Sequence, residues 1–226
     1  INNLPLVMHV YKRTKLSKKV NEVFICCDDK KIYNVVKKYG AKVIMTSKHH
    51  PNGTDRICEA FKKIKNNNKY NLVVDVQGDE PLISPNHIDK VIDYHLKNME
   101  VDIILPNLKI KFTNNTNLVK LVTNKKNDVL YISRANIPYE FKNRVKYLKK
   151  HLSVVSFKPQ SLINFGKSGV SELEKIEDIE LLRAIDIGLK IRTVNLKGDS
   201  FSIDIFEDYK KAQIQISRDR YFKFYR

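Results

Sequence analysis

The segment LVVDVQGDEPL, residues 72–82, decides how this sequence is interpreted. It opens with a run of apolar and β-branched residues, a pattern that predicts a buried strand. The strand is followed by a glycine, two adjacent acids and a proline, a combination that neither packs in a core nor continues a helix. Residues 77–81 are therefore either a simple turn, with Pro81 starting the next helix, or a loop that presents Asp79 to a ligand.

Similar runs recur along the first half of the chain. Further strands are predicted at VFICC (23–27), KVIM (42–45) and VDIIL (101–105), and stretches with helical spacing such as TDRICEAFKKIK separate them. Alternating strands and helices predict an α/β fold, with a mostly parallel sheet and helices on both faces. Ligands of such sheets bind beyond the carboxyl ends of the strands. Asp79 follows one of these ends.

The pattern changes after about residue 106. LVKLVT, DVLYIS and HLSVVSF are typical of strands, with little helix between them, so we expect a mixed or antiparallel extension of the sheet. A long amphipathic helix is predicted over about 172–187. Ser171 and Glu174 have the spacing of a capping box at its start, and Gly188 is expected to end it.

The composition limits the classes of protein to consider. The chain has 226 residues without a linker, repeat or low-complexity block, so we predict one domain over residues 1–226. Its formal net charge is +17, but the lysines are spread through every segment. We interpret this charge as a compositional bias, with a nucleic-acid surface as the weaker alternative. Only the tail ISRDRYFKFYR, residues 216–226, is both basic and aromatic, and it is expected either to fray or to dock.

The cysteines and the apolar runs indicate a compartment. Cys26, Cys27 and Cys58 are odd in number and lack the spacing of metal ligands, which fits a reducing cytoplasm. No apolar run approaches the roughly 20 residues that cross a bilayer. We therefore expect a cytoplasmic protein without a membrane partner.

Two aspartates are candidates for a metal site. Asp79 offers a hard oxygen donor at a predicted strand end, and this suits Mg²⁺, which takes only one or two protein carboxylates. The segment SIDIFED (202–208) offers Asp204 as a second, between the predicted strand IRTVNL (191–196) and a last helix beginning near Phe206. Helix capping is the competing role for Asp204. The residues alone leave both roles open.

Six segments occur in an order and spacing known from one enzyme family. VVDVQGDEPLI, HHPNGTDRICEA, LYISRANIP, KHLSVVSF, SELEKIEDIELLRAIDIG and SIDIFED resemble segments of the 3-deoxy-manno-octulosonate cytidylyltransferases, or CMP-Kdo synthetases, across nearly the whole chain. The resemblance implies a Rossmann-like nucleotidyltransferase fold and a homodimer. It also implies a Mg²⁺-dependent reaction of CTP with the eight-carbon sugar acid Kdo, which releases pyrophosphate and supplies lipopolysaccharide or capsule biosynthesis.

The resemblance assigns the catalytic and nucleotide-binding residues. Asp79 and Asp204 fall where the family places its two Mg²⁺ ligands, and this is the pairing that the carboxylate chemistry favours. Gln77 and Arg56 fall, with Asp79, among the residues that bind CTP.

Three further residues fall where the family binds its sugar acid: Arg134, His151 and Glu180. A guanidinium suits a substrate carboxylate because its fork bonds both oxygens. Each residue also has an ordinary structural alternative. Arg134 would be a surface ion-pair partner, His151 a hydrogen-bonded structural histidine, and Glu180 one more charge on a solvated helix face.

The start of the chain departs from the family pattern. The family begins with a strand and a loop of the form IPARxxSxRLPGKPL, whose Arg, Ser and Lys bind the triphosphate, whereas this chain begins at INNLPLVMHV. We interpret the sequence as truncated by roughly one strand and its loop. Activity is expected only if the natural protein contains that loop. Without it, the chain would be a nucleotide-binding pseudoenzyme.

Other departures concern the sugar acid. Val155 stands where the family has Tyr, and Leu181 where it has Gln, so two hydrogen-bonding groups are absent. The loss of a polar partner changes discrimination between substrates by about 1–3 kcal/mol. An amino-ulosonic acid or a nine-carbon acid is therefore the alternative substrate.

Overall fold

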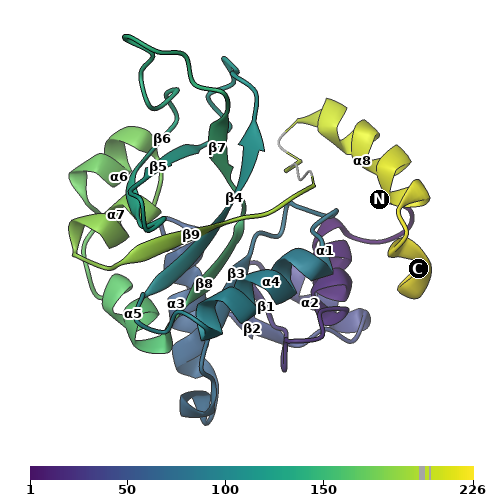
Figure 1. The fold of residues 1–226 in the computed structure, drawn as a ribbon. Helices are drawn as coiled ribbons and strands as arrows, with labels where there is room; N and C mark the ends of the chain where they lie inside the picture. Colours follow the sequence, from purple (N-terminus) through teal and green to yellow (C-terminus); the bar gives the residue numbers. More distant parts are fainter. Residues whose placement is uncertain (199–201, 204) are drawn as a thin grey trace. The chain divides into compact units, whose positions relative to one another are not determined.

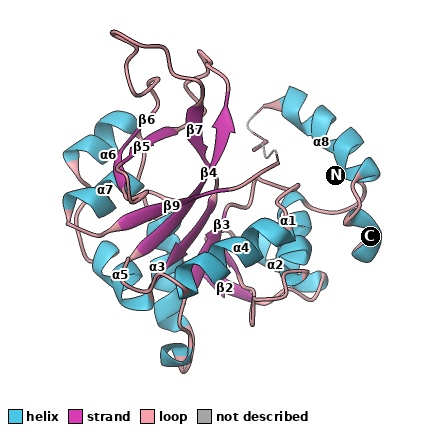
Figure 2. Cartoon of the chain, viewed as in Figure 1, coloured by secondary structure: helices cyan, strands magenta, loops and turns pink. Residues whose placement is uncertain are grey.

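The computed structural model describes residues 1–198, 202–203 and 205–226 (Figure 1). The chain divides into two compact units, the first made of Ile1–Asn67, Val76–Lys90 and Ser200–Arg226 and the second of Asn68–Asp75 and Val91–Asp199. Each unit contains strands and helices, so the α/β class is confirmed (Figure 2). A single domain over residues 1–226 stays a prediction.

The first unit contains a parallel pair of short strands, β1 (Ile25–Cys27) and β2 (Val43–Met45). Its helices, in chain order, are α1 (Leu6–Lys15), α2 (Lys30–Lys38), α3 (Gly53–Lys63) and α8 (Phe206–Arg218), and the short η2 (Phe222–Phe224) ends the chain. Its apolar cluster joins α1 to β1 and α2 through Met8, Tyr11, Ile25, Val36 and Ala41. Burial of these side chains is the main force that holds α1 in place.

Local chemistry explains where two of these helices start. Asp29 caps α2, and its carboxylate accepts hydrogen bonds from the N–H groups of Lys31 and Ile32. Asn52 caps α3 in the same way, through the N–H of Asp55. Both caps satisfy donors that have no partner within the helix.

The second unit is organised by a mixed sheet. Among the described residues, seven strands form this sheet in the order β3-β8-β4-β7-β5-β6, and β9 also pairs with β4. Their bounds are β3 Val73–Val76, β4 Ile103–Ile110, β5 Lys120–Thr123, β6 Val129–Ser133, β7 Leu148–His151, β8 Val154–Phe157 and β9 Ile191–Asn195. β4 runs parallel to β9 but antiparallel to β7 and β8. The predicted antiparallel extension is confirmed, and it is larger than the sequence pattern indicated.

The predicted strand at 101–105 overlaps β4, whose apolar start is buried on both faces. In β4, the first six residues are all buried, and Ile103, Ile104 and Leu105 are fully inaccessible. A strand with partners on both sides and packing above and below needs such a continuous apolar run. The remaining helices are α4 (Pro85–Leu96), α5 (Pro159–Phe165), α6 (Glu172–Glu177) and α7 (Leu181–Asp186), and the 3₁₀ turn η1 covers Asn67–Lys69.

The prediction of one long helix over about 172–187 is wrong, because two shorter helices cover this segment. Asp178 adopts a left-handed conformation, with a φ of 52°, and ends α6 there, so that α7 starts separately at Leu181. The capping box at Ser171 and Glu174 is confirmed. Gly188, with a φ of 78°, lies just beyond α7 as predicted, because glycine accepts a positive φ without strain.

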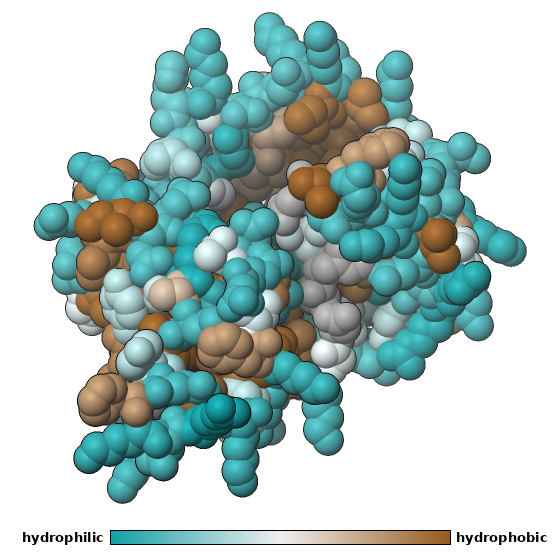
Figure 3. All heavy atoms as spheres, turned by 90° about the horizontal axis from the view of Figure 1, so that it is seen from above, coloured by the Kyte–Doolittle hydropathy of each residue, from teal (hydrophilic) through white to brown (hydrophobic). Residues whose placement is uncertain are grey.

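Hydrophilic side chains dominate the face drawn in Figure 3, with apolar patches between them. In the described ranges, none of the helices has the length and apolar character that a membrane span requires.

Candidate functional site

The loop after β3 carries Asp79, whose side chain is half-buried. The main-chain carbonyl of Asp79 accepts a hydrogen bond from the N–H of Ile203, with an N···O distance of 3.0 Å. Residues 202–203 therefore lie against this loop, within the first unit. Asp204, the second expected metal ligand, follows Ile203 in the sequence and lies outside the described residues.

The loop is longer than a simple turn. Helix α4 begins at Pro85 and not near Pro81, so several residues after Asp79 are irregular. The chain there is held by main-chain contacts such as the 3.1 Å hydrogen bond from Ile83 to the carbonyl of Glu80. This geometry favours a ligand-presenting loop over a turn that only connects a strand to a helix.

The donor set suits a divalent cation. Carboxylate oxygens are hard ligands, and Mg²⁺ completes its shell with water and phosphate oxygens after taking one or two of them. The part of the chain that the structure describes contains no group of three or more His, Cys, Asp or Glu side chains placed to hold a metal.

Gln77 lies beside the start of α3. A Cβ atom built on Gly53, the first residue of α3, would lie 3.4 Å from the side-chain nitrogen of Gln77. The amide of Gln77 thus reaches the end of the helix that also carries Arg56. Two of the predicted nucleotide-binding residues are therefore close together in the first unit.

Arg56 is held in a fixed orientation by its neighbours. Its Nη2 donates to Asp28 Oδ2 at 2.8 Å, and its Nη1 donates to Thr46 Oγ1 at 2.9 Å. The two charged side chains are partly exposed, 21% for Arg56 and 32% for Asp28. A guanidinium held on one edge by a carboxylate keeps its remaining donors oriented for an anion.

Arg134 follows the last residue of β6 and binds the end of α6. Its Nε donates to the carbonyl of Glu177 at 2.7 Å, and its Nη2 donates to the carbonyl of Asp178 at 2.9 Å. Helix termini leave such carbonyls without intrahelical partners. Arg134 therefore caps α6, and its side chain is still 33% exposed.

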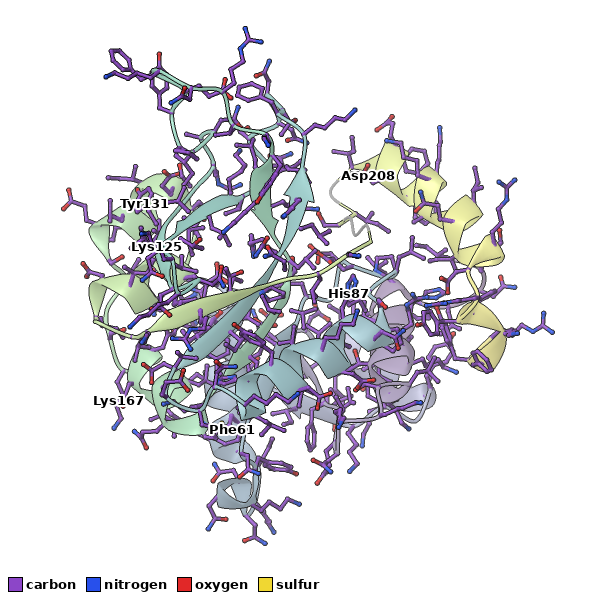
Figure 4. All side chains as sticks on the ribbon, in the orientation of Figure 1. Phe61, His87, Lys125, Tyr131, Lys167 and Asp208 are labelled. Atoms are coloured by element: carbon purple, nitrogen blue, oxygen red, sulfur yellow. The ribbon has the colours of Figure 1, made fainter. Side chains whose placement is uncertain are left out.

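Glu177 joins several groups around Arg134. Its carboxylate accepts hydrogen bonds from the hydroxyl of Ser133 at 2.6 Å and from the N–H of Arg134 at 2.9 Å. Tyr131, labelled in Figure 4, comes from the same strand β6. Burial raises the pKa of Tyr131, and the charge of Glu177 and a hydrogen bond to it act in the same direction.

The register of three strands brings His151 to the same region. Lys120 of β5 lies opposite Ser133 of β6 and opposite Lys150 of β7. Arg134 and His151, each one residue further along, therefore flank Lys120. The ammonium group of Lys120 is buried and donates to the carbonyl of Arg134, and burial lowers its pKa.

His151 is neutral at pH 7. Burial, together with the charges of Lys150 and Arg134, lowers its pKa to about 4. Its Nδ1 is buried and makes no hydrogen bond to the described residues. A neutral imidazole in this position can bind a hydroxyl group.

Glu180 occupies the N-cap position of α7, and its side chain does not cap that helix. It lies two residues beyond Asp178, which Arg134 contacts. Arg183, three residues after Glu180, is buried in an ion pair with Glu174, with two N···O distances of 2.6 Å. Arg134, His151 and Glu180 thus belong to neighbouring elements of the second unit.

Asp28, Lys120 and Glu177 were not predicted from the sequence. Asp28 had a recognisable signal, because DD directly follows the strand VFICC, as Asp79 follows VVDV. Lys120 and Glu177 had none. Lysine in a strand and glutamate in a helix read as solvated residues until tertiary contacts are known.

Comparisons with known proteins identify the family of the chain. Residues 1–191 match the family model described as cytidylyltransferase. A 3-deoxy-manno-octulosonate cytidylyltransferase of Thermodesulfovibrio yellowstonii is 38% identical over 94% of this chain and 88% of its own. An 8-amino-3,8-dideoxy-manno-octulosonate cytidylyltransferase of Shewanella baltica is 33% identical over 97% of this chain and 91% of its own.

A solved structure has the same fold. It is CMP:2-keto-3-deoxy-manno-octonic acid synthetase complexed with CTP, which matches with a TM-score of 0.87 and 27% sequence identity over 95% of this chain and 88% of that chain.

Proposed function

Because the chain belongs to the cytidylyltransferase family, we propose that it joins CTP to the sugar acid Kdo, giving the CMP-sugar and pyrophosphate. The observation that carries this proposal is the hydrogen bond between Ile203 and Asp79, which holds the segment before Asp204 against the metal-binding loop. Gln77 and Arg56 belong to the same unit as this loop. The expected product would supply lipopolysaccharide or capsule biosynthesis.

The reaction is an in-line nucleotidyl transfer. The anomeric hydroxyl of the sugar acid attacks the α-phosphorus of CTP and loses its proton, a new P–O bond forms, and the bond to the β-phosphate breaks. Such a reaction depends on positioning and on neutralised charge, without a covalent intermediate. Asp79 and Asp204 would hold Mg²⁺, and this ion would neutralise the charge that develops on the phosphate oxygens.

The nucleotide would be held by residues of the first unit. The amide of Gln77 both donates and accepts hydrogen bonds, so it can bind the polar edge of a base or a ribose hydroxyl. Arg56, oriented by Asp28, would bind an anionic or carbonyl oxygen of CTP. The net charge of +17 would also attract a triphosphate from a distance.

The sugar acid would be held by residues of the second unit. Arg134 would bind its carboxylate, because part of the guanidinium is exposed and the only contact of Nη1 within the described residues is a long one to the carbonyl of Thr116, at 3.4 Å. Neutral His151 would bind a hydroxyl group. Glu180 would accept a hydrogen bond from a second hydroxyl group.

A second candidate substrate is the 8-amino sugar acid. Val155 and Leu181 replace hydrogen-bonding residues of the family and are buried, with exposed fractions of 6% and 3%. They cannot bind the hydroxyl groups that a Tyr and a Gln would bind, which changes the discrimination between related acids. The Shewanella baltica relative carries the amino-sugar name.

We propose a homodimer that forms through the middle section of the chain. Tyr139 and Phe141 are 83% and 84% exposed, and Phe112 is 57% exposed. Exposed aromatic residues of this kind favour burial against a second copy. We also propose a cytoplasmic location, because the three cysteines are free thiols, and two of them are buried.

One experiment tests the substrate. The purified protein is incubated with CTP, Mg²⁺ and each member of a panel of acids: Kdo, 8-amino-Kdo and a nine-carbon acid. Pyrophosphate release with Kdo is the expected result. Release with 8-amino-Kdo alone would assign the second candidate substrate. CTP binding without pyrophosphate release from any acid would assign a pseudoenzyme. Salt-sensitive binding of random oligonucleotides without a response to CTP would remove the enzyme assignment.

A further inference from the structure

The basic aromatic tail docks on α1. The imidazole of His9 lies 5.9 Å from the ring of Phe222 and 5.7 Å from the ring of Tyr225, measured between centroids. The ammonium group of Lys12 donates to the main-chain carbonyl of Tyr225 at 3.0 Å. The end of the chain is thus attached to α1 by both aromatic and polar contacts.

Arg13 of the same helix connects the tail to a second segment. Its Nη1 binds Asp219 Oδ2 at 2.6 Å, and its guanidinium carbon lies 5.1 Å from the ring centre of Tyr221. Its Nε and Nη2 donate to the carbonyls of Ile83 and Leu82, at 2.7 and 3.0 Å. Arg13 itself is only 1% exposed.

A guanidinium buried to this degree is stable only when its donors are satisfied. Each of the three guanidinium nitrogens of Arg13 donates a hydrogen bond, one to a carboxylate and two to carbonyls, and these acceptors come from two segments far apart in the sequence. A lysine could not replace it, because an ammonium group lacks the planar fork that reaches three acceptors in fixed directions. The arrangement therefore fixes the two segments relative to each other.

Both segments lead to the metal-binding loop. Leu82 and Ile83 follow Asp79 by three and four residues. Asp219 is the C-cap of α8, and Ile203, just before α8, donates to the carbonyl of Asp79. Arg13 thus holds the C-terminal end of α8 and the C-terminal end of the loop that begins with Asp79. The hydrogen bond between Ile203 and Asp79 joins the segment before α8 to the start of that loop.

We propose that Arg13 and Asp219 are positioning residues for the metal site, so that the docked tail determines how tightly Asp79 binds its cation. This inference rests on the proposed function, in which Asp79 is a metal ligand. Loss of a group that hydrogen-bonds a metal ligand directly weakens metal binding about 10- to 100-fold. Arg13 acts one step further out, through the carbonyls of Leu82 and Ile83, so the expected effect lies at the lower end of this range.

The test measures Mn²⁺ binding to the purified protein with CTP present, by electron paramagnetic resonance, well below the unfolding temperature. Asp219→Asn and Arg13→Lys are each expected to raise the Kd for Mn²⁺ about 10-fold. The KM for the sugar acid at saturating metal is expected to stay unchanged. If the two residues act through one bond, the double variant binds Mn²⁺ no more weakly than the worse single variant.

Asp128→Asn is the matched control. Asp128 pairs with Arg192 at 2.8 Å in the second unit, and its side chain is 15% exposed, against 18% for Asp219. This variant is expected to bind Mn²⁺ as the wild type does. Folded Asp219→Asn protein with the wild-type Kd would overturn the inference, since a purely structural role for the tail would lower the melting temperature without changing Mn²⁺ affinity. Failure of the proposed function is distinguishable, because the wild type with CTP would then bind no more Mn²⁺ than the same concentration of CTP binds without protein.

Discussion

The main-chain N–H of Ile203 and the main-chain carbonyl of Asp79 are joined by a 3.0 Å hydrogen bond, although most of the chain separates the two residues in sequence. The contact joins the loop after β3 to the segment that precedes α8. A main-chain contact of this kind does not depend on either side chain. Substitutions of Asp79 therefore test its carboxylate without removing this link between the two segments.

Asp79→Asn is expected to reduce Mn²⁺ affinity and turnover by at least about 100-fold, because an amide cannot replace a carboxylate as a charged oxygen ligand. The variant is nearly isosteric, so its melting temperature should stay close to that of the wild type. Titration with Mn²⁺ in the presence of CTP, followed by turnover assays, measures both effects. Asp93→Asn changes another half-buried aspartate, in α4, and should leave both quantities unchanged. Wild-type metal affinity in Asp79→Asn would contradict the assignment.

Asp28→Asn tests how Arg56 is oriented. Removal of the carboxylate leaves the Nη2 of Arg56 without its 2.8 Å ionic partner. Because the pair is partly exposed, we expect a modest effect, a rise of roughly two- to fivefold in the KM for CTP. The KM for the sugar acid should not change. Steady-state kinetics with each substrate varied in turn separates the two constants.

Glu22→Gln provides the control for Asp28→Asn. Glu22 forms an ion pair with Lys42 at 2.7 Å in the same unit, and the Lys42 side chain is 58% exposed. Like Asp28→Asn, Glu22→Gln removes one negative charge, but it leaves the contacts of Arg56 unchanged. An equal rise in the KM for CTP in both variants would show that net charge, and not the orientation of Arg56, determines the effect.

Periodicity explains which parts of the fold were predictable. The strand VDIIL and the last helix near Phe206 were recognised because their apolar patterns are local, and the capping box at Ser171 is likewise a local signal. Helix α1 was missed, because its ten residues mix buried polar groups such as His9 and Arg13 with apolar ones. Such groups are buried only because the tail and the loop supply partners from far along the chain.

The end of α6 shows the same limit at the candidate site. The sequence from Glu172 onward has helical spacing throughout, yet the helix ends at Asp178 because Arg134, from β6, binds the carbonyls released there. A tertiary contact thus overrides a local preference. The resemblance placed Arg134 at the sugar acid, but only the structure shows that it also holds α6.

Arg134→Ala is expected to have two effects. It removes the cap of α6 and should lower the free energy of unfolding by about 1–2 kcal/mol. It should also raise the KM for the sugar acid about 10-fold or more, because a charged partner of the substrate carboxylate is lost. Arg134→Lys should restore part of the binding but little of the cap, since one ammonium group cannot reach both carbonyls.

Arg144→Ala is the control for Arg134→Ala, since Arg144 is exposed in the same section of the chain. It should change neither stability nor sugar-acid kinetics. Chemical denaturation measures the first quantity and sugar saturation curves the second. A stability loss in Arg134→Ala with unchanged sugar kinetics would assign Arg134 to the support of α6 alone.

Buried histidines predict how stability depends on pH. His95 is fully buried, its Nδ1 lies 2.8 Å from Ser156 Oγ, and burial lowers its pKa to about 4. The unfolded chain binds a proton at about pH 6.5, whereas the folded protein does not until about pH 4. The contribution of each such histidine to the free energy of unfolding is therefore fully present above about pH 6.5. It falls as the pH drops toward 4, by about 1.4 kcal/mol per pH unit.

The contribution of His95 can be separated from that of His151, whose pKa also lies at about 4. His95→Gln retains a hydrogen-bonding group near Ser156 but does not titrate, so proton uptake on unfolding between pH 6 and 4.5 should fall by about one proton. His49→Gln, at an exposed position, should leave the uptake unchanged. Urea denaturation at a series of pH values measures it as the slope of unfolding free energy against pH. An unchanged slope in His95→Gln would mean that His95 is already protonated in the folded protein, in conflict with its burial.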